Sequence, residues 1–347
     1  MTTPSKQRPV PYTVVGAGAI GGTLAFHLAR AGHPVTVVDS DRDHIHAVAT
    51  RGLRLLRDAT TSTVTVAAAM TPDPSPPDHA EAQLGRVLLA VKAQATGPAL
   101  DWIAPRLRPD GFVVSLQNGL NEQVIAERIG AERTVGAFVN LFADVTAPGE
   151  IRDGGLGALV VGEMNGSVSD RVRSVVQDLH AWGPARVTDN VAGFLWSKLG
   201  FGAMLTATAL ADAPMADLID ANRAVMYRLT AEVFDVSEAM GIRLEAFDAF
   251  DPLPYAGDDQ EEKDKATDRL VSWLRTQPKD RSGIWRDLAV RRRPTEVPTH
   301  YEAMLREADR LAVPTPMVRE LLRQIRHLED GDAMSTERIS NLLGVTA

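Results

Sequence analysis

A glycine-rich run near the beginning of this 347-residue sequence has the spacing of a phosphate-binding loop. It follows a β-type run from Tyr12 to Val15 and opens a helical pattern over residues 19–31, which Gly32 ends. The first glycine of such a run allows a tight turn, the second lets a pyrophosphate approach, and the third packs helix against strand. Amides at the start of the helix then face the phosphates. We therefore predict a dinucleotide-binding loop made by Gly16, Ala17, Gly18, Ala19, Ile20 and Gly21.

Asp39 follows the second predicted strand, Val35 to Val38, at the place where an acid can accept hydrogen bonds from the adenosine ribose. Its carboxylate would repel a 2′-phosphate, and its neighbour Ser40 carries no positive charge to offset that repulsion. Asp39 and Ser40 are therefore predicted to bind the cofactor and to favour NAD over NADP. In the alternative interpretation, Arg42 clamps a 2′-phosphate while Asp39 only caps the next helix.

Short β-branched runs alternate with helical patterns over the first 165 residues, which is typical of repeated βαβ units and a mostly parallel sheet. After a turn at residues 147–149, we expect residues 150–152 to pair with 158–162 as a hairpin. Four prolines between Thr71 and Asp78 predict a loop there. Further strands are expected at residues 87–91, 112–115 and 134–139.

After about residue 190 the apolar residues recur at helical spacing instead. Residues 251–265 are rich in acids, Pro and Gly and lack an apolar face, so we expect a surface loop there. The chain is thus predicted to be an α/β protein, with a Rossmann domain over residues 1–190 and an all-α substrate and dimerisation domain over 191–347. A ligand cleft is expected between the two. The helical stripes are Val225, Leu229, Val233, Val236 and Met240, and then Val318, Leu321, Leu322, Ile325 and Leu328.

Composition excludes several other classes of protein. A net charge of −8 disfavours nucleic acid and anionic membrane surfaces as partners, and the chain has no Cys for disulfides or thiolate metal sites. The eight histidines lack metal-ligand spacing, and there is no Gly-x-Ser-x-Gly elbow of a hydrolase. A polar start and the lack of a long apolar run favour a cytoplasmic protein without a metal, acting on a small molecule.

Several motifs in this order resemble the ketopantoate reductase family: the run from Gly16 to Gly22, Val91-Lys92-Ala93, the run from Leu116 to Leu120, and the run from Leu195 to Leu199. Residues 146–149 and 294–297 fit the family as well. The resemblance implies that hydride from a nicotinamide reduces a 2-oxo acid to a 2-hydroxy acid. It also implies a homodimer, since the helical domains of this family often dimerise.

The resemblance assigns roles to individual residues. Lys198 matches the family's catalytic lysine, Glu296 its active-site glutamate, and Asn118 an asparagine near the nicotinamide. The cofactor-binding residues expected from the two middle motifs are Val91, Lys92, Gln117 and Asn118.

These roles make chemical sense, although structural alternatives stay open. Reduction of a ketone builds negative charge on the carbonyl oxygen, and an ammonium group can stabilise that charge and supply the proton. Lys198 lies in an otherwise apolar stretch, where a lysine without a function would be out of place. The structural alternative is that its amine snorkels to solvent from a helix end. Asn118 could instead form only an Asn-Gly turn. Glu296 could keep a nearby amine charged, or could be a surface carboxylate that neutralises residues 291–293.

The predicted substrate pocket departs from the family pattern. The family commonly has asparagines four and eight residues after the lysine, where this sequence has Gly202 and Thr206. Its substrate-binding serine aligns with Gly283, next to Ser282. We expect these changes to alter the substrate more than the reaction, and Arg281 or Arg286 could clamp a carboxylate or merely be solvated. The predicted substrate-binding residues are Lys198, Gly202, Thr206, Ser282, Trp285 and Arg286.

Two other functions remain open from the sequence. One is an oxidoreductase that uses the same hydride chemistry on an imine or an amino-acid-derived substrate. The other is a protein that senses the cofactor and has lost catalysis, although Lys198 and Glu296 argue against that loss.

Overall fold

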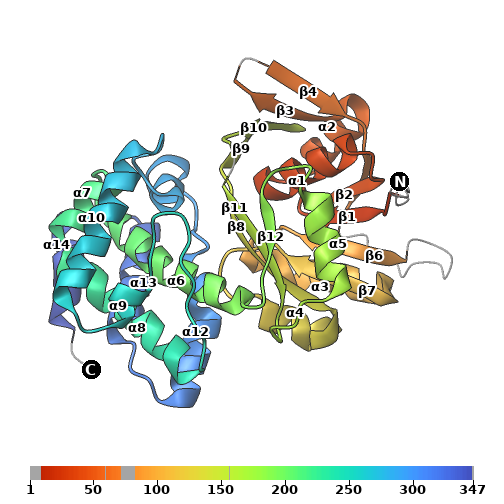
Figure 1. The fold of residues 1–347 in the computed structure, drawn as a ribbon. Coiled ribbons are helices and arrows are strands. Elements are labelled where there is room, and N and C mark those ends of the chain that lie inside the picture. The colour runs from red at the N-terminus through yellow and green to blue at the C-terminus, as the bar shows by residue number, and fades with distance from the viewer. Residues whose placement is uncertain (1–8, 59, 72–82, 156, 346–347) are drawn as a thin grey trace, which may run out of the picture. The chain divides into compact units, whose positions relative to one another are not determined.

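The computed structural model describes residues 9–58, 60–71, 83–155 and 157–345 (Figure 1). By its internal contacts the chain divides into two compact units, Met1–Val191 and Ala192–Ala347. The loop predicted over residues 71–78 falls outside the described residues from residue 72 on.

The first unit is built on a mostly parallel sheet, which confirms the predicted α/β class. Every pairing in this sheet is parallel except that of β11 with β8. In spatial order, its described strands are β12 (Ala185–Val187), β11 (Ala158–Glu163), β8 (Thr134–Asn140), β7 (Leu107–Ser115), β6 (Leu84–Leu89), β1 (Tyr12–Val15), β2 (Val35–Asp39) and β5 (Ala67–Met70).

Helices cover both faces of this sheet because successive strand residues point to opposite sides. Val14 belongs to one buried cluster with residues of α1 and α5, whereas Val15 belongs to another with residues of α3 and α4. The helices are α1 (Ala19–Arg30), α2 (Arg42–Arg51), α3 (Thr96–Ile103), α4 (Glu122–Ile129) and α5 (Asp170–Leu179), with short 3₁₀ turns η1 (Ala93–Ala95), η2 (Ala104–Arg106) and η3 (Ala131–Arg133).

The predicted hairpin between residues 150–152 and residues 158–162 was wrong, because these segments belong to different sheets. Residues 150–152 lie in a second, smaller sheet. Its strand order is β4 (Thr60–Val64), β3 (Leu53–Arg57), β10 (Glu150–Asp153) and β9 (Ala143–Ala147), while β11 pairs with β8 in the main sheet. The cause is packing. Ile151 is fully buried against α1, where a Cβ on Gly22 would lie 2.2 Å from its Cδ1. Leu159 belongs to the same buried cluster, but it lies on β11, which pairs with β8 and β12 in the main sheet.

The second unit is helical, as predicted. Apolar residues occur all round α6 (Val191–Thr208), which is typical of a buried helix. A Cβ on its Gly200 would lie 2.4 Å from the Phe234 ring of α8. The other described elements are α7 (Met215–Ala221), α8 (Arg223–Ala239), α9 (Leu253–Ala256), α10 (Gln260–Thr276), α11 (Gly283–Trp285), a π-helical turn η4 (Arg286–Arg291), α12 (Val297–Leu311), α13 (Pro316–Glu329), α14 (Thr336–Asn341) and the 3₁₀ turn η5 (Leu342–Gly344).

The two apolar stripes lie on α8 and α13 and are buried, except for Met240 just beyond α8. The expectation of a loop over residues 251–265 was wrong, because α9 and the beginning of α10 lie within it. Asp259 caps α10 by accepting hydrogen bonds from the amides of Glu261 and Glu262. The acids that suggested a loop thus stabilise the start of a helix.

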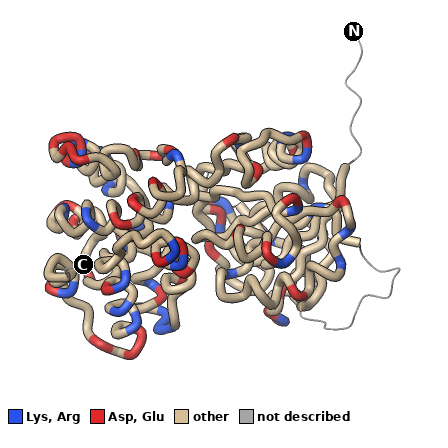
Figure 2. Tube along the Cα trace, turned by 90° about the horizontal axis from the view of Figure 1, so that it is seen from below, with Lys and Arg blue, Asp and Glu red and all other residues tan. Residues whose placement is uncertain are grey.

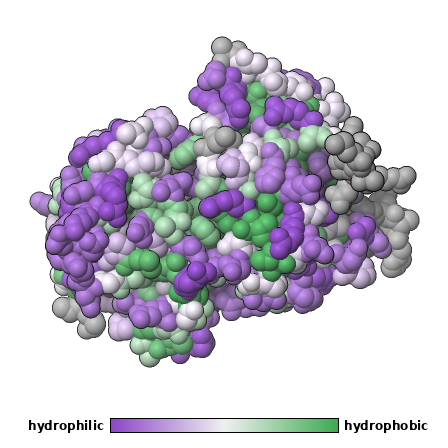
Figure 3. Space-filling model, in the orientation of Figure 1, coloured by the Kyte–Doolittle hydropathy of each residue, from purple (hydrophilic) through white to green (hydrophobic). Residues whose placement is uncertain are grey.

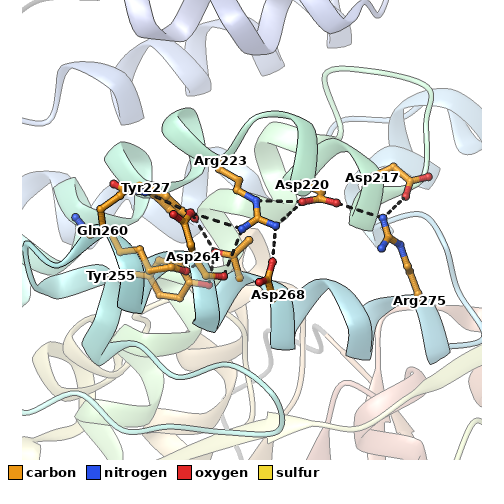
Figure 4. A network of polar contacts seen from close by, with 11 residues as sticks. Asp217, Asp220, Arg223, Tyr227, Tyr255, Gln260, Asp264, Asp268 and Arg275 are labelled. Atoms are coloured by element: carbon orange, nitrogen blue, oxygen red, sulfur yellow. Dashed lines mark hydrogen bonds and ion pairs between the residues drawn. The ribbon is translucent and has the colours of Figure 1, made fainter.

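Ion pairs connect α7, α8 and α10 around Arg223 (Figure 4). The Arg223 guanidinium lies 2.6 Å from both Asp220 and Asp268, and the Tyr227 hydroxyl donates to Asp264 at 2.7 Å. At the end of this network, Arg275 pairs with Asp217 and Asp220.

Charges of both signs are interspersed along both units (Figure 2). The face seen in Figure 3 is mostly hydrophilic, with hydrophobic residues gathered in limited areas. None of the described helices is both long and apolar enough to cross a membrane.

Candidate active site

The three glycines of the predicted loop, two before α1 and one in its first turn, have three different surroundings. Gly16 has φ +95°, and a Cβ there would lie 2.5 Å from the Val91 amide nitrogen. A Cβ on Gly21 would lie 2.0 Å from the Gly16 carbonyl oxygen, so this residue packs the helix against the loop. A Cβ on Gly18 would meet no protein atom within 4 Å. The loop is therefore closed on the protein at its first and last glycines and open at the middle one, where a pyrophosphate would approach.

Asp39 is fixed at the end of β2 by two backbone donors. The Ala17 amide donates to its Oδ2 at 2.7 Å, and the Asp41 amide donates to its Oδ1 at 2.9 Å. The cap of α2 is Asp41, which accepts from the His44 amide at 2.9 Å. Asp39 does not cap this helix, so that part of the alternative interpretation is wrong. Ser40 and Arg42 are exposed.

A dinucleotide fits this arrangement. The loop leaves space at Gly18, and Ala19 and Ile20 form the first turn of α1, where amides have no partner within the helix. The Asp39 carboxylate keeps lone pairs on both oxygens that could accept from ribose hydroxyls.

Gln117 lies inside the protein and holds a neighbouring loop. It is 5% exposed, and its Nε2 donates to the Val91 carbonyl at 3.0 Å and to Thr96 Oγ1 at 2.7 Å. Lys92, between these two partners, is exposed. Asn118 is also exposed, and its carbonyl accepts from the side chain of Asn121 at 2.7 Å. These contacts place Lys92 and Asn118 at the carboxyl ends of β6 and β7.

A buried carboxyl that was not predicted from the sequence stands directly after the Asn118 turn. Glu122 is the first residue of α4, is 3% exposed, and has one oxygen without a hydrogen-bond partner among the described residues. Burial raises the pKa of Glu122 to about 7, although nearby amides and the Ser115 hydroxyl oppose that shift.

Lys198 is partly buried on α6, and the acid whose charge acts on it was not predicted from the sequence. Burial lowers the pKa of Lys198 to about 8, and the charge of Asp248 opposes that shift. Asp248 lies in an irregular segment after α8 with φ +46°. A single acid in such a segment gives no periodic signal, which is why the sequence did not reveal it.

The positions of the two missing asparagines lie beside Tyr301 of α12. A Cβ on Gly202 would lie 3.4 Å from the Tyr301 hydroxyl, which donates to the Leu199 carbonyl at 3.1 Å. Thr206 is buried, and its hydroxyl donates to the Gly202 carbonyl at 2.7 Å. Glu296 is partly exposed immediately before α12. The Tyr301 contact therefore brings the beginning of α12 to the turn of α6 that carries Lys198.

Trp285 and Arg286 line a pocket of about 360 Å³ together with Pro278, Lys279, Asp280 and Arg281. Trp285 Nε1 and Arg286 Nε have no hydrogen-bond partner among the described residues. Arg281, in contrast, is paired with Asp280 and Asp212.

Ser282 does not line this pocket. It is 7% exposed, and its hydroxyl caps α11 by accepting from the Trp285 amide. No group of His, Asp or Glu side chains that could hold a metal occurs within the described ranges.

A glycine loop on a mostly parallel sheet, followed by a helical unit with a partly buried amine, is the arrangement expected of a nicotinamide-dependent oxidoreductase. Residues 12–166 match the family model described as ketopantoate reductase PanE/ApbA, and residues 190–329 match its C-terminal counterpart. The chain belongs to the ketopantoate reductase family.

Individual relatives agree with this membership. A 2-dehydropantoate 2-reductase of Mesorhizobium japonicum is 29% identical over 342 residues, covering 91% of this chain and 97% of the relative. One of Halobacterium salinarum is 31% identical over 234 residues, covering 66% of this chain and 75% of the relative. The crystal structure of a PanE/ApbA family ketopantoate reductase from Ralstonia eutropha JMP134 has a TM-score of 0.75 and 28% identity, covering 92% and 98% of the two chains.

Proposed function

We propose that this chain reduces a 2-oxo acid, ketopantoate or a related compound, to the 2-hydroxy acid, with Lys198 as the proton donor. The observation that carries the proposal is the Lys198 amine on an apolar helix, in a chain similar to the 2-dehydropantoate 2-reductase of Mesorhizobium japonicum over 97% of that protein's length. The bound nicotinamide would supply the hydride.

The lowered pKa of Lys198 suits a proton donor. At about 8 it leaves most of the amine charged at neutral pH, yet its proton is given up more readily than that of an ordinary lysine. The charged amine would stabilise the developing alkoxide and then protonate it. Since only the ammonium form acts, reduction should slow as pH rises through about 8.

The substrate carboxylate is proposed to bind Arg286, with Trp285 beside it. Two observations support this assignment: both side chains line the pocket, and each has a donor nitrogen that makes no hydrogen bond with the described residues. Arg281 is a weaker candidate because its guanidinium is already paired with Asp280 and Asp212. Asn118 is proposed to lie near the nicotinamide and Glu296 to act as the active-site glutamate, the roles that the resemblance assigns to them.

We also propose NAD as the preferred cofactor, because the fixed carboxylate of Asp39 would repel a 2′-phosphate. The protein is further proposed to be a cytoplasmic homodimer. Sedimentation of the purified protein tests the dimer, which a monomeric mass at micromolar concentration would refute.

The test of the function is a substrate screen that follows oxidation of NADH and of NADPH. A panel of 2-oxo acids, including ketopantoate and larger analogues, is compared with the same compounds plus ammonia or an amine. Turnover of an oxo acid alone is expected. Turnover only when an amine is present would favour the imine alternative. A folded protein that binds NADH and turns over no compound would overturn the proposal.

A further inference from the structure

We propose that Asp248 is a positioning residue for Lys198, whose carboxylate keeps the amine in its charged, proton-donating form. This inference rests on the proposed function for its catalytic meaning. The placement of Asp248 beside α6 follows from contacts within the helical unit.

The turn that carries Asp248 is closed by two backbone hydrogen bonds. The Phe247 amide donates to the Phe250 carbonyl at 3.0 Å, and the Phe250 amide donates to the Phe247 carbonyl at 2.8 Å. Asp248 adopts the left-handed conformation within this turn, and its side chain is exposed rather than packed. Glycine would suit this backbone best, and among other residues Asp and Asn tolerate it most readily. The turn alone therefore does not explain why a negative charge stands here.

Contacts on either side of Lys198 hold the turn against α6. The Glu245 amide donates to the Ser197 hydroxyl at 3.1 Å. One helical turn further along α6, the Phe201 ring lies 6.1 Å from the Phe247 ring and 5.1 Å from the Phe250 ring.

The Phe250 ring also stacks on Tyr255 at 5.4 Å. Ser197 and Phe201 bracket Lys198 in the sequence, so the segment anchored to them is fixed beside the turn of α6 that carries the amine.

The electrostatics agree with this placement. Burial lowers the pKa of Lys198, and the carboxylate of Asp248 is the charge that opposes that effect. Glu245, on the same segment, is paired with Arg243 at 3.1 Å. From α12, the neutral Tyr301 hydroxyl contacts the Leu199 carbonyl, and Glu296 stands before the same helix. Without Asp248, a larger fraction of the Lys198 amine would be uncharged at neutral pH, and that fraction could not protonate an alkoxide.

The direct test is the titration of Lys198 itself in the full chain. The sequence contains six lysines, so carbon-13 methylation of their amines gives a spectrum simple enough to titrate, and Lys198→Arg identifies the signal. In Asp248→Asn the turn keeps a tolerated residue but loses the charge. We expect the Lys198 midpoint to fall by about 0.5 to 1 pH unit in this variant.

Three further variants serve as controls for this titration. Asp248→Glu should restore most of the shift, and Asp251→Asn, three residues away on the same segment, should leave the midpoint unchanged. Asp248→Gly suits the positive φ and should repeat the Asn result, so a folding defect of one variant does not end the test. A midpoint that stays within about 0.2 pH unit of wild type in both charge-free variants overturns the proposal.

Kinetics then connect the titration to turnover. With a substrate from the screen, the fall of kcat/KM at high pH should move to lower pH in Asp248→Asn, while the KM for NADH stays the same. The titration uses no substrate, so it can fail or succeed independently of the proposed function. If the midpoint shifts but the kinetic profile does not, Asp248 sets the charge without serving the reaction and the positioning role is wrong.

Discussion

Substituting Gly18 by Ala separates cofactor binding from folding. Gly18 has φ −66° and ψ −161°, an extended conformation open to alanine, and its new Cβ would meet no protein atom within 4 Å. An alanine at a compatible position reduces the entropy of the unfolded chain and stabilises by about 0.4–1 kcal/mol. The same methyl group would occupy the space in which a pyrophosphate must approach the loop. We expect the Kd for NADH to rise about tenfold or more, which is a loss of roughly 1.4 kcal/mol or more.

Gly16→Ala should behave in the opposite way. Its φ of +95° costs an L-residue about 1–2 kcal/mol, and its Cβ would lie 2.5 Å from the Val91 nitrogen, which is backbone and cannot easily move. With overpacking of about 1–3 kcal/mol added, the total loss of stability is about 2–5 kcal/mol. Gly97→Ala is the matched control, because its Cβ would also meet no atom within 4 Å and it lies on α3 rather than in the loop.

The assay combines chemical unfolding of the three variants with NADH fluorescence titration. Gly18→Ala should unfold like Gly97→Ala while binding NADH more weakly. If Gly18→Ala binds NADH as tightly as wild type, the phosphate loop does not bind the cofactor as proposed.

Three further predictions concern charged groups in both units. Asp39→Asn keeps an acceptor for the loop amides but loses the charge, so the preference for NADH over NADPH in KM should fall about tenfold, and an unchanged ratio would contradict the role of this carboxylate. Burial raises the folded-state pKa of Glu122 to about 7. The contribution of this protonated carboxyl to the free energy of unfolding is therefore complete below its unfolded-state pKa and is lost as the pH rises through about 7. The unfolding free energy of wild type relative to Glu122→Gln should therefore fall by about 3 kcal/mol between pH 4 and pH 8, and a pH-independent difference would refute the shift. Arg223 is 27% exposed and pairs with Asp220 and Asp268, so Arg223→Ala should cost about 2 kcal/mol in urea unfolding. Arg275→Ala, whose side chain is 53% exposed, should cost under about 1 kcal/mol, and equal costs would contradict the larger contribution of the less exposed arginine.

The main architecture could be predicted because it repeats local signals. Strands β1, β2, β7 and β8 of the main sheet contain short β-branched runs, and the apolar stripes of α8 and α13 have the helical period. The second sheet could not be predicted, because β10 pairs with β3, about a hundred residues away, and no local pattern distinguishes that pairing from a hairpin. The helix α10 was missed because its first turns are exposed and acidic, so they carry a cap rather than an apolar face.

The sequence predicted which site residues lie close together only where those residues are on neighbouring elements of the chain. The glycine loop and Asp39 lie on consecutive elements, so their spacing predicted their proximity. Asp248 lies 50 residues beyond Lys198 and reaches α6 only through the packing of Phe247 and Phe250, which no local pattern reveals. Gln117 has a structural role that the sequence did not reveal, because its side-chain amide holds the Val91 loop from inside. Its expected role in binding the cofactor stays a prediction.

The most direct test of the central claim is the rate of 2-oxo acid reduction in Lys198→Ala under saturating NADH. The rate should fall by about a hundredfold or more, because the proton donor and the charge that stabilises the alkoxide are both lost. The Kd for NADH, measured by fluorescence, should stay close to the wild-type value, and Lys263→Ala should leave both quantities unchanged. A Lys198→Ala enzyme that turns over at the wild-type rate would contradict the account.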